Sequence, residues 1–281
     1  MKIGFIGAGH VGFSLSKWIN QRCKCVCGIY SSNIEDSFEC AKFSISEYYK
    51  NLDELVLNCD TLFLTVNDDS IKDIVEELLK LNVKNKILIH TSGSLSSSVF
   101  KDLKINNDCF SIHPIYAFSD KYESYKHLDD AYFTLEGSNK HIEELKLLFN
   151  NKLIVIDSEK KKKYHLACSL ISNMVCGIVD ISEEIFKEIG IENREIYMPL
   201  FLNISNNINN MGALNSLTGP IIRNDIETVK GHINNLDNDE LYIYKYLGLH
   251  LISMSKKRTN NDYSQMKVLL EEIKNGNSKY I

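Results

Sequence analysis

Short runs of β-branched and aromatic residues alternate with amphipathic segments through the first half of the chain. Consecutive apolar positions predict buried strands, and apolar positions three and four residues apart predict one face of a helix. The predicted strands are Lys2–Ile6, Lys24–Tyr30, Thr61–Val66, Lys86–His90, Cys109–Ile112, Tyr132–Glu136 and Leu153–Ile156. The predicted helices are Val11–Arg22, Ser70–Leu81, Ser97–Lys104 and Lys140–Asn150. This alternation indicates an α/β domain with a doubly wound parallel sheet.

The pattern changes after Asp157, where only helical periodicity remains. The predicted helices cover residues 160–189, 193–211, 224–235, 239–257 and 262–275. The first is apolar on all sides in its middle, so it should be buried in a helical domain or against another subunit. We therefore expect two closely packed domains, residues 1–157 and an all-α domain of residues 158–281.

The composition is that of an ordinary globular protein, with 44% hydrophobic and 25% charged residues among 281. A net charge of -5 argues against a nucleic-acid or anionic-membrane partner, and the basic run at residues 160–163 is expected to be a solvated helix end. The longest apolar stretch, Leu166–Ile181, is shorter than the roughly 20 residues of a membrane span. An apolar strand begins at Lys2, where a signal peptide would stand. We expect a soluble, cytoplasmic protein.

The eight cysteines do not predict a disulfide framework or a metal site. Cys23, Cys25 and Cys27 alternate, and on a strand they would share one face, a spacing that suits neither a disulfide nor zinc. The remaining five are scattered, with no C-x-x-C pair. We expect small apolar residues in a reducing compartment.

A glycine-rich motif stands where the first strand meets the first helix. Gly7, Gly9 and Gly12 complete the pattern G-x-G-x-x-G, with His10 and Val11 between them. The first glycine allows the tight turn, the second lets backbone approach a pyrophosphate, and the third lets helix and strand pack closely. This context predicts a Rossmann domain that binds a dinucleotide; the alternative is a structural turn without a ligand.

The end of the second strand favours NADP over NAD. An acidic residue there binds the ribose 2′-hydroxyl and repels a 2′-phosphate, but this chain has Ser31 and Ser32 after Tyr30. Hydroxyl donors accept a phosphate, so NADP is the expected cofactor. NAD is the alternative, because Glu35 supplies an acid if the strand ends later.

Polar segments follow three strands and should meet at the carboxyl edge of the sheet. Asn67 is expected at the cofactor, with Asp68 or Asp69 either beside it or capping the helix that begins at Ser70. Ser92 and Gly93 lie in a loop that should approach the nicotinamide ribose. His113 ends a strand, where it is placed to contact substrate or to serve the structure.

A polar stripe marks the start of the second domain. Lys161, His165, Ser169 and Asn173 recur every four residues, so they share a slowly drifting helix face. A buried polar group needs a partner, so the stripe should meet neighbouring helices or a ligand. We favour a site, with His165 or Lys161 as proton donor and Asn173 beside them.

A second candidate ligand group is Arg223, which follows Leu217-Thr218-Gly219-Pro220. Arginine suits a substrate carboxylate, and pairing with Asp225 or capping a helix is the equal alternative.

Six segments together resemble the bacterial family that joins a Rossmann-like domain to a C-terminal helical domain of unknown function, whose members are assigned in general terms as NADP oxidoreductases. The segments are GFIGAGHVG, HTSGSLSS, SIHPIYAF, AYFTLEG, YHLACSLISN and SLTGPIIRND, and the resemblance covers nearly the whole chain. The layout is similar to that of pyrroline-5-carboxylate reductases and, more distantly, of 3-hydroxyisobutyrate and 6-phosphogluconate dehydrogenases.

The resemblance implies a lysine and an asparagine facing the nicotinamide from the first helix of the second domain. The nearest equivalents are His165 and Asn173, with Lys161 one turn before His165. The close lysine–asparagine spacing of the dehydrogenases is absent, which counts against a 3-hydroxyacid dehydrogenase mechanism. The resemblance also implies a homodimer built through the helical domain.

These features lead to two hypotheses for a dinucleotide-binding protein, beside a third in which the protein is a structural dimer with an empty Rossmann fold that no dinucleotide stabilises. The first is an NADP-dependent oxidoreductase that transfers a hydride to or from a small carbonyl, hydroxyl or imine substrate, with His165, Asn173 and His113 on the substrate side. The second is a dinucleotide-binding sensor or regulatory protein without catalysis. An open cleft at His165 and Asn173 favours the enzyme, and a sealed one favours the sensor.

Overall fold

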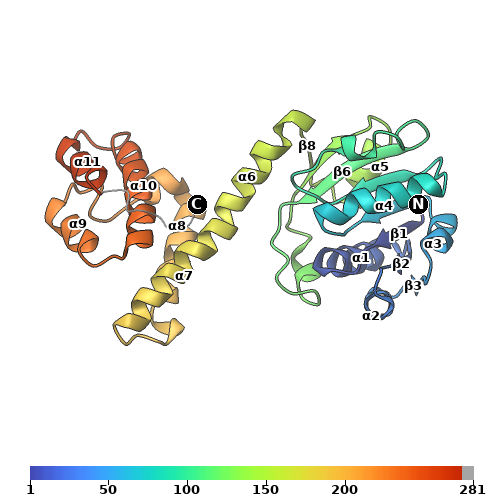
Figure 1. The fold of residues 1–281 in the computed structure, drawn as a ribbon, viewed down its shortest axis with the longest axis horizontal. Coiled ribbons are helices and arrows are strands. Elements are labelled where there is room, and N and C mark those ends of the chain that lie inside the picture. Colours follow the sequence, from blue (N-terminus) through green and yellow to red (C-terminus); the bar gives the residue numbers. More distant parts are fainter. Residues whose placement is uncertain (274–281) are drawn as a thin grey trace. The chain divides into compact units, whose positions relative to one another are not determined.

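The computed structural model describes residues 1–273, which divide by their contacts into two compact units, Met1–Val175 and the described part of Cys176–Ile281. The first unit is an α/β domain (Figure 1). Its strands are β1 (Ile3–Ile6), β2 (Val26–Tyr30), β3 (Glu47–Tyr48), β4 (Thr61–Leu64), β5 (Ile87–His90), β6 (Asp108–Pro114), β7 (Phe133–Gly137) and β8 (Leu153–Val155). Its helices are α1 (His10–Cys23), α2 (Ile34–Ser44), α3 (Leu52–Asn58), α4 (Asp68–Lys80), α5 (Ile142–Leu148) and α6 (Lys161–Ile171).

One sheet contains all eight strands, in the order β3-β2-β1-β4-β5-β6-β7-β8. The predicted doubly wound α/β class is confirmed, with one difference: β7 runs antiparallel to β6. A strand parallel to β6 would need a crossover connection that carries the chain back to the end of the sheet where β6 begins. The connection at residues 115–132 contains only a short 3₁₀ turn, η2 (Ser124–His127), and β7 starts at the end of the sheet where β6 stops.

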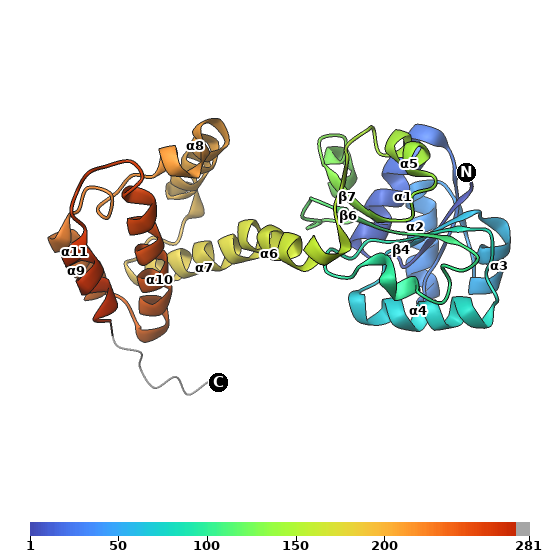
Figure 2. The same ribbon diagram turned by 90° about the horizontal axis from the view of Figure 1, so that it is seen from above.

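Helices cover both faces of the sheet, with α1 and α5 on one side and α4 on the other (Figure 2). Alternating strand residues supply the two apolar cores. On β4, Phe63 packs into the core beneath α1 and α5, whereas Leu62 and Leu64 pack into the core beneath α3 and α4. Successive side chains of a strand point to opposite faces of the sheet, and here both faces are covered by helices. Every position of such a strand is therefore buried, which is why its sequence is a continuous apolar run.

Three elements of this unit were not predicted: α2, α3 and β3. The buried face of α2 consists of Ser37, Cys40, Ala41 and Ser44, so it carries no stripe of large apolar residues. The α3 helix has two turns and β3 has two residues. The segment predicted as a helix over residues 97–104 is instead the 3₁₀ turn η1 (Ser97–Phe100).

The second unit is helical in the part that the structure describes. It contains most of α7 (Asn173–Glu188), then η4 (Arg194–Ile196), α8 (Met198–Ser216), α9 (Ile226–Ile233), α10 (Asn238–Ser255) and α11 (Ser264–Glu271). Its core lies among α9, α10 and α11, where Val229, Met266 and Leu270 are fully buried. The predicted helix over residues 262–275 ends earlier, at Glu271, and residues 274 and 275 lie outside the described residues.

The single helix predicted over residues 160–189 is two helices that meet at Ser172. The Ser172 hydroxyl donates to the carbonyl of Cys168 at 2.7 Å, a back-bond that bends helices. The division between the units falls just beyond this break, between Val175 and Cys176, and not at the turn near Asp157. The physical reason is that α6 makes side-chain contacts with the sheet of the first unit.

The long apolar helix, expected to be buried in a helical domain or against another subunit, is not buried within the single chain. Of the described residues, the helical stretch Ser158–Glu188 is long and apolar enough to span a membrane by length and composition, and its best window has a mean hydropathy of 1.4 and no residue buried inside the chain. The stretch is longer than Leu166–Ile181 because the helix continues through polar residues at both ends.

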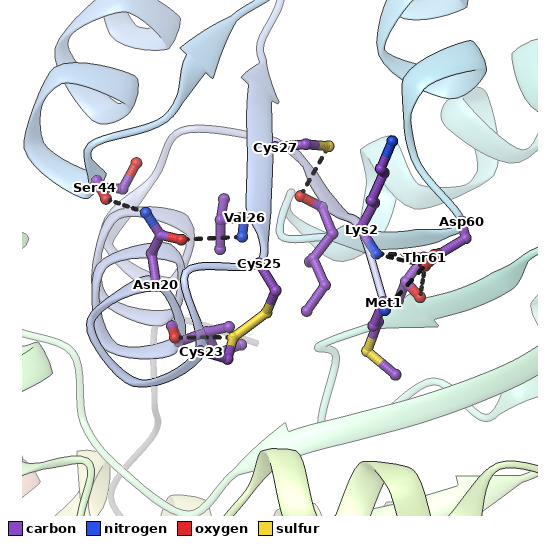
Figure 3. The surroundings of a disulfide bond; sticks show 12 residues. Met1, Lys2, Asn20, Cys23, Cys25, Val26, Cys27, Ser44, Asp60 and Thr61 are labelled. Carbon is purple, nitrogen blue, oxygen red and sulfur yellow. Dashed lines mark hydrogen bonds and ion pairs between the residues drawn. A yellow bond between two sulfur atoms is a disulfide. The ribbon is translucent and has the colours of Figure 1, made fainter.

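Two of the cysteines form a disulfide, which contradicts the expectation of reduced thiols. Cys23 and Cys25 are joined, with their Cα atoms 5.2 Å apart (Figure 3). On a continuous strand the two side chains would share one face without pairing, but Cys23 ends α1 and Lys24 is left-handed, with a φ of 49°. This turn brings the two side chains together before β2 begins. Cys27 lies on β2, and its thiol donates to the carbonyl of Ile3.

Candidate functional site

The glycine loop between β1 and α1 has the geometry that its sequence predicts. A Cβ on Gly7, whose φ is +107°, would lie 2.7 Å from the Val66 side chain, and one on Gly12 would lie 2.2 Å from the Gly7 carbonyl oxygen. No atom lies within 4 Å of a Cβ built on Gly9, so backbone there is open to a ligand. The first turn of α1 has no acidic residue, which leaves its positive end for an anion.

The two residues inside this motif have different surroundings. The His10 ring nitrogen Nδ1 lies 2.9 Å from the carbonyl oxygen of Phe118, which ties the start of α1 to the β6–β7 connection. Val11 is half-buried and packs against the apolar core. His10 remains exposed beside the loop and Val11 supports the loop from within.

The end of β2 places hydroxyls beside the amino end of α2. β2 ends at Tyr30, and the side chain of Asn33 caps α2 by accepting from the backbone N–H of Glu35 at 2.9 Å. Among the described residues, no side-chain hydrogen bond occupies the hydroxyls of Ser31 or Ser32. Glu35 lies in the first helical turn and not on the strand, so no carboxylate stands at the strand end.

The loop after β4 differs from its prediction. α4 begins at Asp68, not at Ser70, and its cap is Asn67, whose side-chain Oδ1 accepts from the backbone N–H of Ser70 at 3.0 Å. Neither Asp68 nor Asp69 is the cap. Asp68 instead accepts a 2.6 Å hydrogen bond from the hydroxyl of Ser94 on the loop after β5.

The loop after β5 is shaped by its own hydroxyls. The Ser92 hydroxyl accepts from the backbone N–H groups of Ser94 and Leu95 at 3.2 and 3.0 Å, so it turns inward. Gly93 brings the loop against two imidazoles: a Cβ there would lie 2.4 Å from Cδ2 of His165 and 2.8 Å from Nε2 of His113. Gly93 is therefore the contact between the loop and the catalytic candidates.

His113, Tyr164 and His165 converge next to Gly93. The His113 ring lies 5.8 Å from the His165 ring, centroid to centroid, and its Nδ1 lies 2.6 Å from the Tyr164 hydroxyl. Burial, followed by the positive charges of Lys161 and His165, lowers the pKa of His113 to about 4. His113 is therefore neutral at physiological pH, and His165 is the exposed member of the group.

Lys161 belongs to the interior. The residue is 1% exposed, and its ammonium donates to Ser111 Oγ at 2.6 Å and to the Ser92 carbonyl at 3.2 Å. Burial lowers its pKa to about 8. The predicted role of Lys161 as a proton donor would require its ammonium to leave these partners. Its position shows a lysine that holds α6 to the loop after β5 and to β6.

Asn173 does not join this cluster. It begins α7 beyond the break at Ser172, about 12 Å along the helix from His165, and its side chain accepts from the Ser172 hydroxyl at 3.1 Å. Arg223 lies in the second unit, exposed, and its charge helps to lower the pKa of Asp225 after the hydrogen bonds from Thr228.

Tyr164 is the residue of this cluster that sequence reasoning did not assign. It lies beside His165 and three residues after Lys161 on the same helix, but a tyrosine at this position is equally typical of an ordinary half-buried aromatic residue.

A cavity of about 500 Å³ borders the loop after β5. It is lined by Lys72, Ser94, Leu95, Ser96, Ser98, Val99, Ser158, Glu159 and Lys162.

Two family models match the sequence. Residues 2–93 match the family described as "NADP oxidoreductase coenzyme F420-dependent", and residues 131–251 match a domain of unknown function, DUF2520. No curated protein sequence matches the chain significantly. The family resemblance inferred from the sequence segments is thus confirmed for both the N-terminal and the C-terminal part of the chain.

Solved structures share the fold. A candidate NADP oxidoreductase from Bacteroides fragilis is 23% identical with a TM-score of 0.74, covering 90% of this chain and 98% of that one. Protein TM1727 from Thermotoga maritima is 27% identical with a TM-score of 0.64, covering 96% and 97%. An imine reductase from Myxococcus stipitatus, in complex with NADP+, is 14% identical with a TM-score of 0.60, covering 97% and 93%.

Proposed function

We propose, on the premise that this chain joins the N-terminal domain of the NADP oxidoreductases to the DUF2520 domain, that it is an NADP-dependent oxidoreductase acting on a small carbonyl, hydroxyl or imine substrate. The observation that carries the proposal is the position of His113 and His165 against Gly93, on the edge of the sheet that also holds the glycine loop. Dinucleotides bind at this edge in doubly wound sheets.

The residues of the cofactor site fit NADP. Gly9 leaves backbone open for the pyrophosphate, and the amino end of α1 attracts its charge. The hydroxyls of Ser31 and Ser32 stand by the amino end of α2, where a 2′-phosphate meets donors and no strand-end carboxylate. Bound NADPH would supply the hydride.

The substrate side uses two imidazoles with different roles. His165 is exposed and can exchange its proton with water, which suits the group that protonates the substrate oxygen or nitrogen. His113 is neutral and lies deeper, which suits a hydrogen-bond donor or acceptor to the same atom. His165 and Asn173 are both exposed within the chain, so packing inside the single chain does not seal them as the sensor hypothesis expects.

We also propose that the protein is a cytoplasmic homodimer in which the helical unit carries the interface. Large apolar side chains on α7 and α8, within the helical unit, are exposed in the single chain: Ile178, Leu200, Leu202, Ile208 and Met211. An apolar surface of this extent is typical of a subunit interface. A second copy would cover it with the same surface, as two-fold symmetry requires.

The test combines binding with turnover. Melting is followed with NADPH, NADP, NADH and NAD, and a ligand at about a hundredfold its Kd should add roughly 2.7 kcal/mol of stability. NADPH consumption is then followed with cyclic imines, ketones and ketoacids, and with oxidised coenzyme F420, which the matched family model names. Stabilisation by NADPH without turnover of any acceptor would support the sensor, and no stabilisation by any dinucleotide would refute the cofactor assignment.

A further inference from the structure

The Tyr164 hydroxyl and the His113 imidazole form a close pair between α6 and β6. The hydroxyl oxygen lies 2.6 Å from Nδ1, and the two rings meet edge to face at a centroid distance of 5.6 Å and an angle of 81°. Both residues are half-buried. The Tyr164 hydroxyl therefore meets Nδ1 of His113 and leaves the other ring nitrogen, Nε2, to other partners.

The chemistry of the two groups decides which one donates. A phenol is a much stronger acid than a neutral imidazole N–H, and an imidazole nitrogen is a better acceptor than a phenol oxygen. The stable arrangement of a neutral pair is therefore O–H donating to Nδ1. Burial raises the pKa of Tyr164 further, so the hydroxyl keeps its proton. The single proton of the neutral ring must then lie on Nε2.

Nε2 of His113 faces the loop after β5. It is the ring nitrogen that a Cβ on Gly93 would meet at 2.8 Å. In the part of the chain that the structure describes, Nε2 has no hydrogen-bond partner, and it is not among the buried unpaired atoms. An N–H at this position is therefore available to a ligand that lies beside Gly93.

We propose that Tyr164 is a positioning residue that holds His113 in the Nε2–H tautomer, so that His113 presents a neutral N–H donor to the substrate beside Gly93. The proposal rests on the proposed function. As a hydride adds to the carbon of a C=O or C=N group, the π electron pair moves to the oxygen or nitrogen, and the His113 N–H hydrogen bond stabilises that growing charge.

The proton that completes the reduction does not come from His113. Loss of the Nε2 proton would leave either an imidazolate or, by transfer through Nδ1, a tyrosinate, and burial disfavours both anions. The new O–H or N–H bond takes its proton from His165 or from water, and His165 is restored by solvent. His113 ends the step as it began, neutral and protonated on Nε2.

The wild-type protein provides the first test, by long-range ¹H–¹⁵N correlation spectra of its histidine rings at neutral pH, with His113→Asn used to identify the His113 signals. We expect the pattern of a single Nε2–H tautomer for His113. A dominant Nδ1–H tautomer would overturn the proposal. This measurement needs no substrate, so it decides the proposal even if no reductase activity is found.

The second test is Tyr164→Phe, which removes only the hydroxyl. We expect His113 to become a mixture of tautomers and kcat to fall about tenfold with KM changed less than twofold, as for the loss of one hydrogen bond that acts in the transition state. An unchanged tautomer with Tyr164→Phe would refute the assignment of the donor.

The chain offers a matched control. Tyr244 and His232 form the same kind of pair in the second unit, with 2.7 Å between the Tyr244 hydroxyl and Nδ1 of His232. Tyr244→Phe should alter the ring spectrum of His232 alone and leave that of His113 and the rate constants unchanged. An equal loss of kcat in both variants would assign the effect of Tyr164→Phe to general destabilisation.

Discussion

The ammonium of Lys161 donates a 2.6 Å hydrogen bond to the hydroxyl of Ser111, and this contact joins α6 to β6 across 50 residues of sequence. A third group, the Ser92 carbonyl, accepts from the same ammonium at 3.2 Å. One buried lysine thus holds together the three elements that carry the site: the helix with Tyr164 and His165, the strand with His113, and the loop with Gly93.

The buried charge of Lys161 should make stability depend on pH in the alkaline range. Its pKa is about 8 in the folded protein against 10.5 in the unfolded chain, so the unfolded chain binds more protons between these values. Stability contributed by this residue therefore rises from pH 8 to 10.5, by about 3 kcal/mol. Urea unfolding of the wild type and of Lys161→Met at pH 8 and 10.5 measures this change in the free energy of unfolding. The free energy of the wild type should rise between the two pH values relative to that of the variant, and an equal change in both proteins would contradict the prediction.

His113 should make the protein sensitive to acid. Lys161 and His165 lower the pKa of His113 and Asp68 raises it, and together with burial they set it at about 4 against 6.5. The unfolded chain binds more protons in this window, so stability is lost as the pH falls from 6.5 to 4, by at most about 3 kcal/mol. In His113→Asn this part of the loss should vanish. Burial also lowers the pKa of His90 to about 4, but His90 is present in both proteins. The difference between their pH dependences of unfolding free energy therefore isolates His113, and an unchanged acid sensitivity would count against its lowered pKa.

Gly93→Ala should impair catalysis more than folding. The added methyl group would overlap Cδ2 of His165 and approach Nε2 of His113, so the imidazoles must move. We expect kcat/KM to fall by at least about tenfold, because a small displacement of catalytic groups is costly, and the unfolding free energy to fall by about 1–3 kcal/mol. The NADPH-dependent shift in melting temperature should persist. Gly231→Ala, at a glycine with open space around it, is the control and should leave activity intact.

Ser32→Asp should reverse the preference between the two cofactors. A carboxylate at the end of β2 repels a 2′-phosphate and accepts from a ribose 2′-hydroxyl. We expect the Kd for NADPH to rise at least about tenfold, and that for NADH to stay equal or fall, in calorimetric titrations. Asn51→Asp introduces the same charge at the start of α3 and should change neither. Equal weakening of both cofactors by Ser32→Asp would instead indicate disturbance of the loop.

Leu200→Glu should separate the proposed dimer. The Leu200 side chain on α8 is 71% exposed in the single chain, and a charge there would be buried in an interface. Sedimentation equilibrium should show a dimer for wild type and a marked shift toward monomer for the variant. Leu57→Glu on α3, at a leucine that is 82% exposed, is the control and should remain dimeric. A monomeric wild-type protein would refute the interface.

The α/β class, most of the strands and the glycine loop could be predicted from the sequence alone. These features are local: a buried strand is an apolar run, and the turn after β1 needs the positive φ of Gly7 and the bare surface of Gly12. The family resemblance rests on segments of the same kind and is confirmed by both family models. The α2 helix escaped this approach because small polar residues make up its buried face.

Which residues of α6 face the sheet depends on tertiary packing and could not be predicted from the sequence. Lys161 and Lys162 are chemically identical and adjacent, yet one is buried and the other exposed, because successive helical residues are rotated by about 100° and docking selects the face. The pairing of Tyr164 with His113 likewise depends on the packing of α6 against β6. Asn173 lies outside the cluster of His113, Tyr164 and His165 because α6 ends before the break at Ser172. The disulfide between Cys23 and Cys25 depends on one left-handed residue between them. Contacts between distant segments are set by packing, which no local pattern specifies.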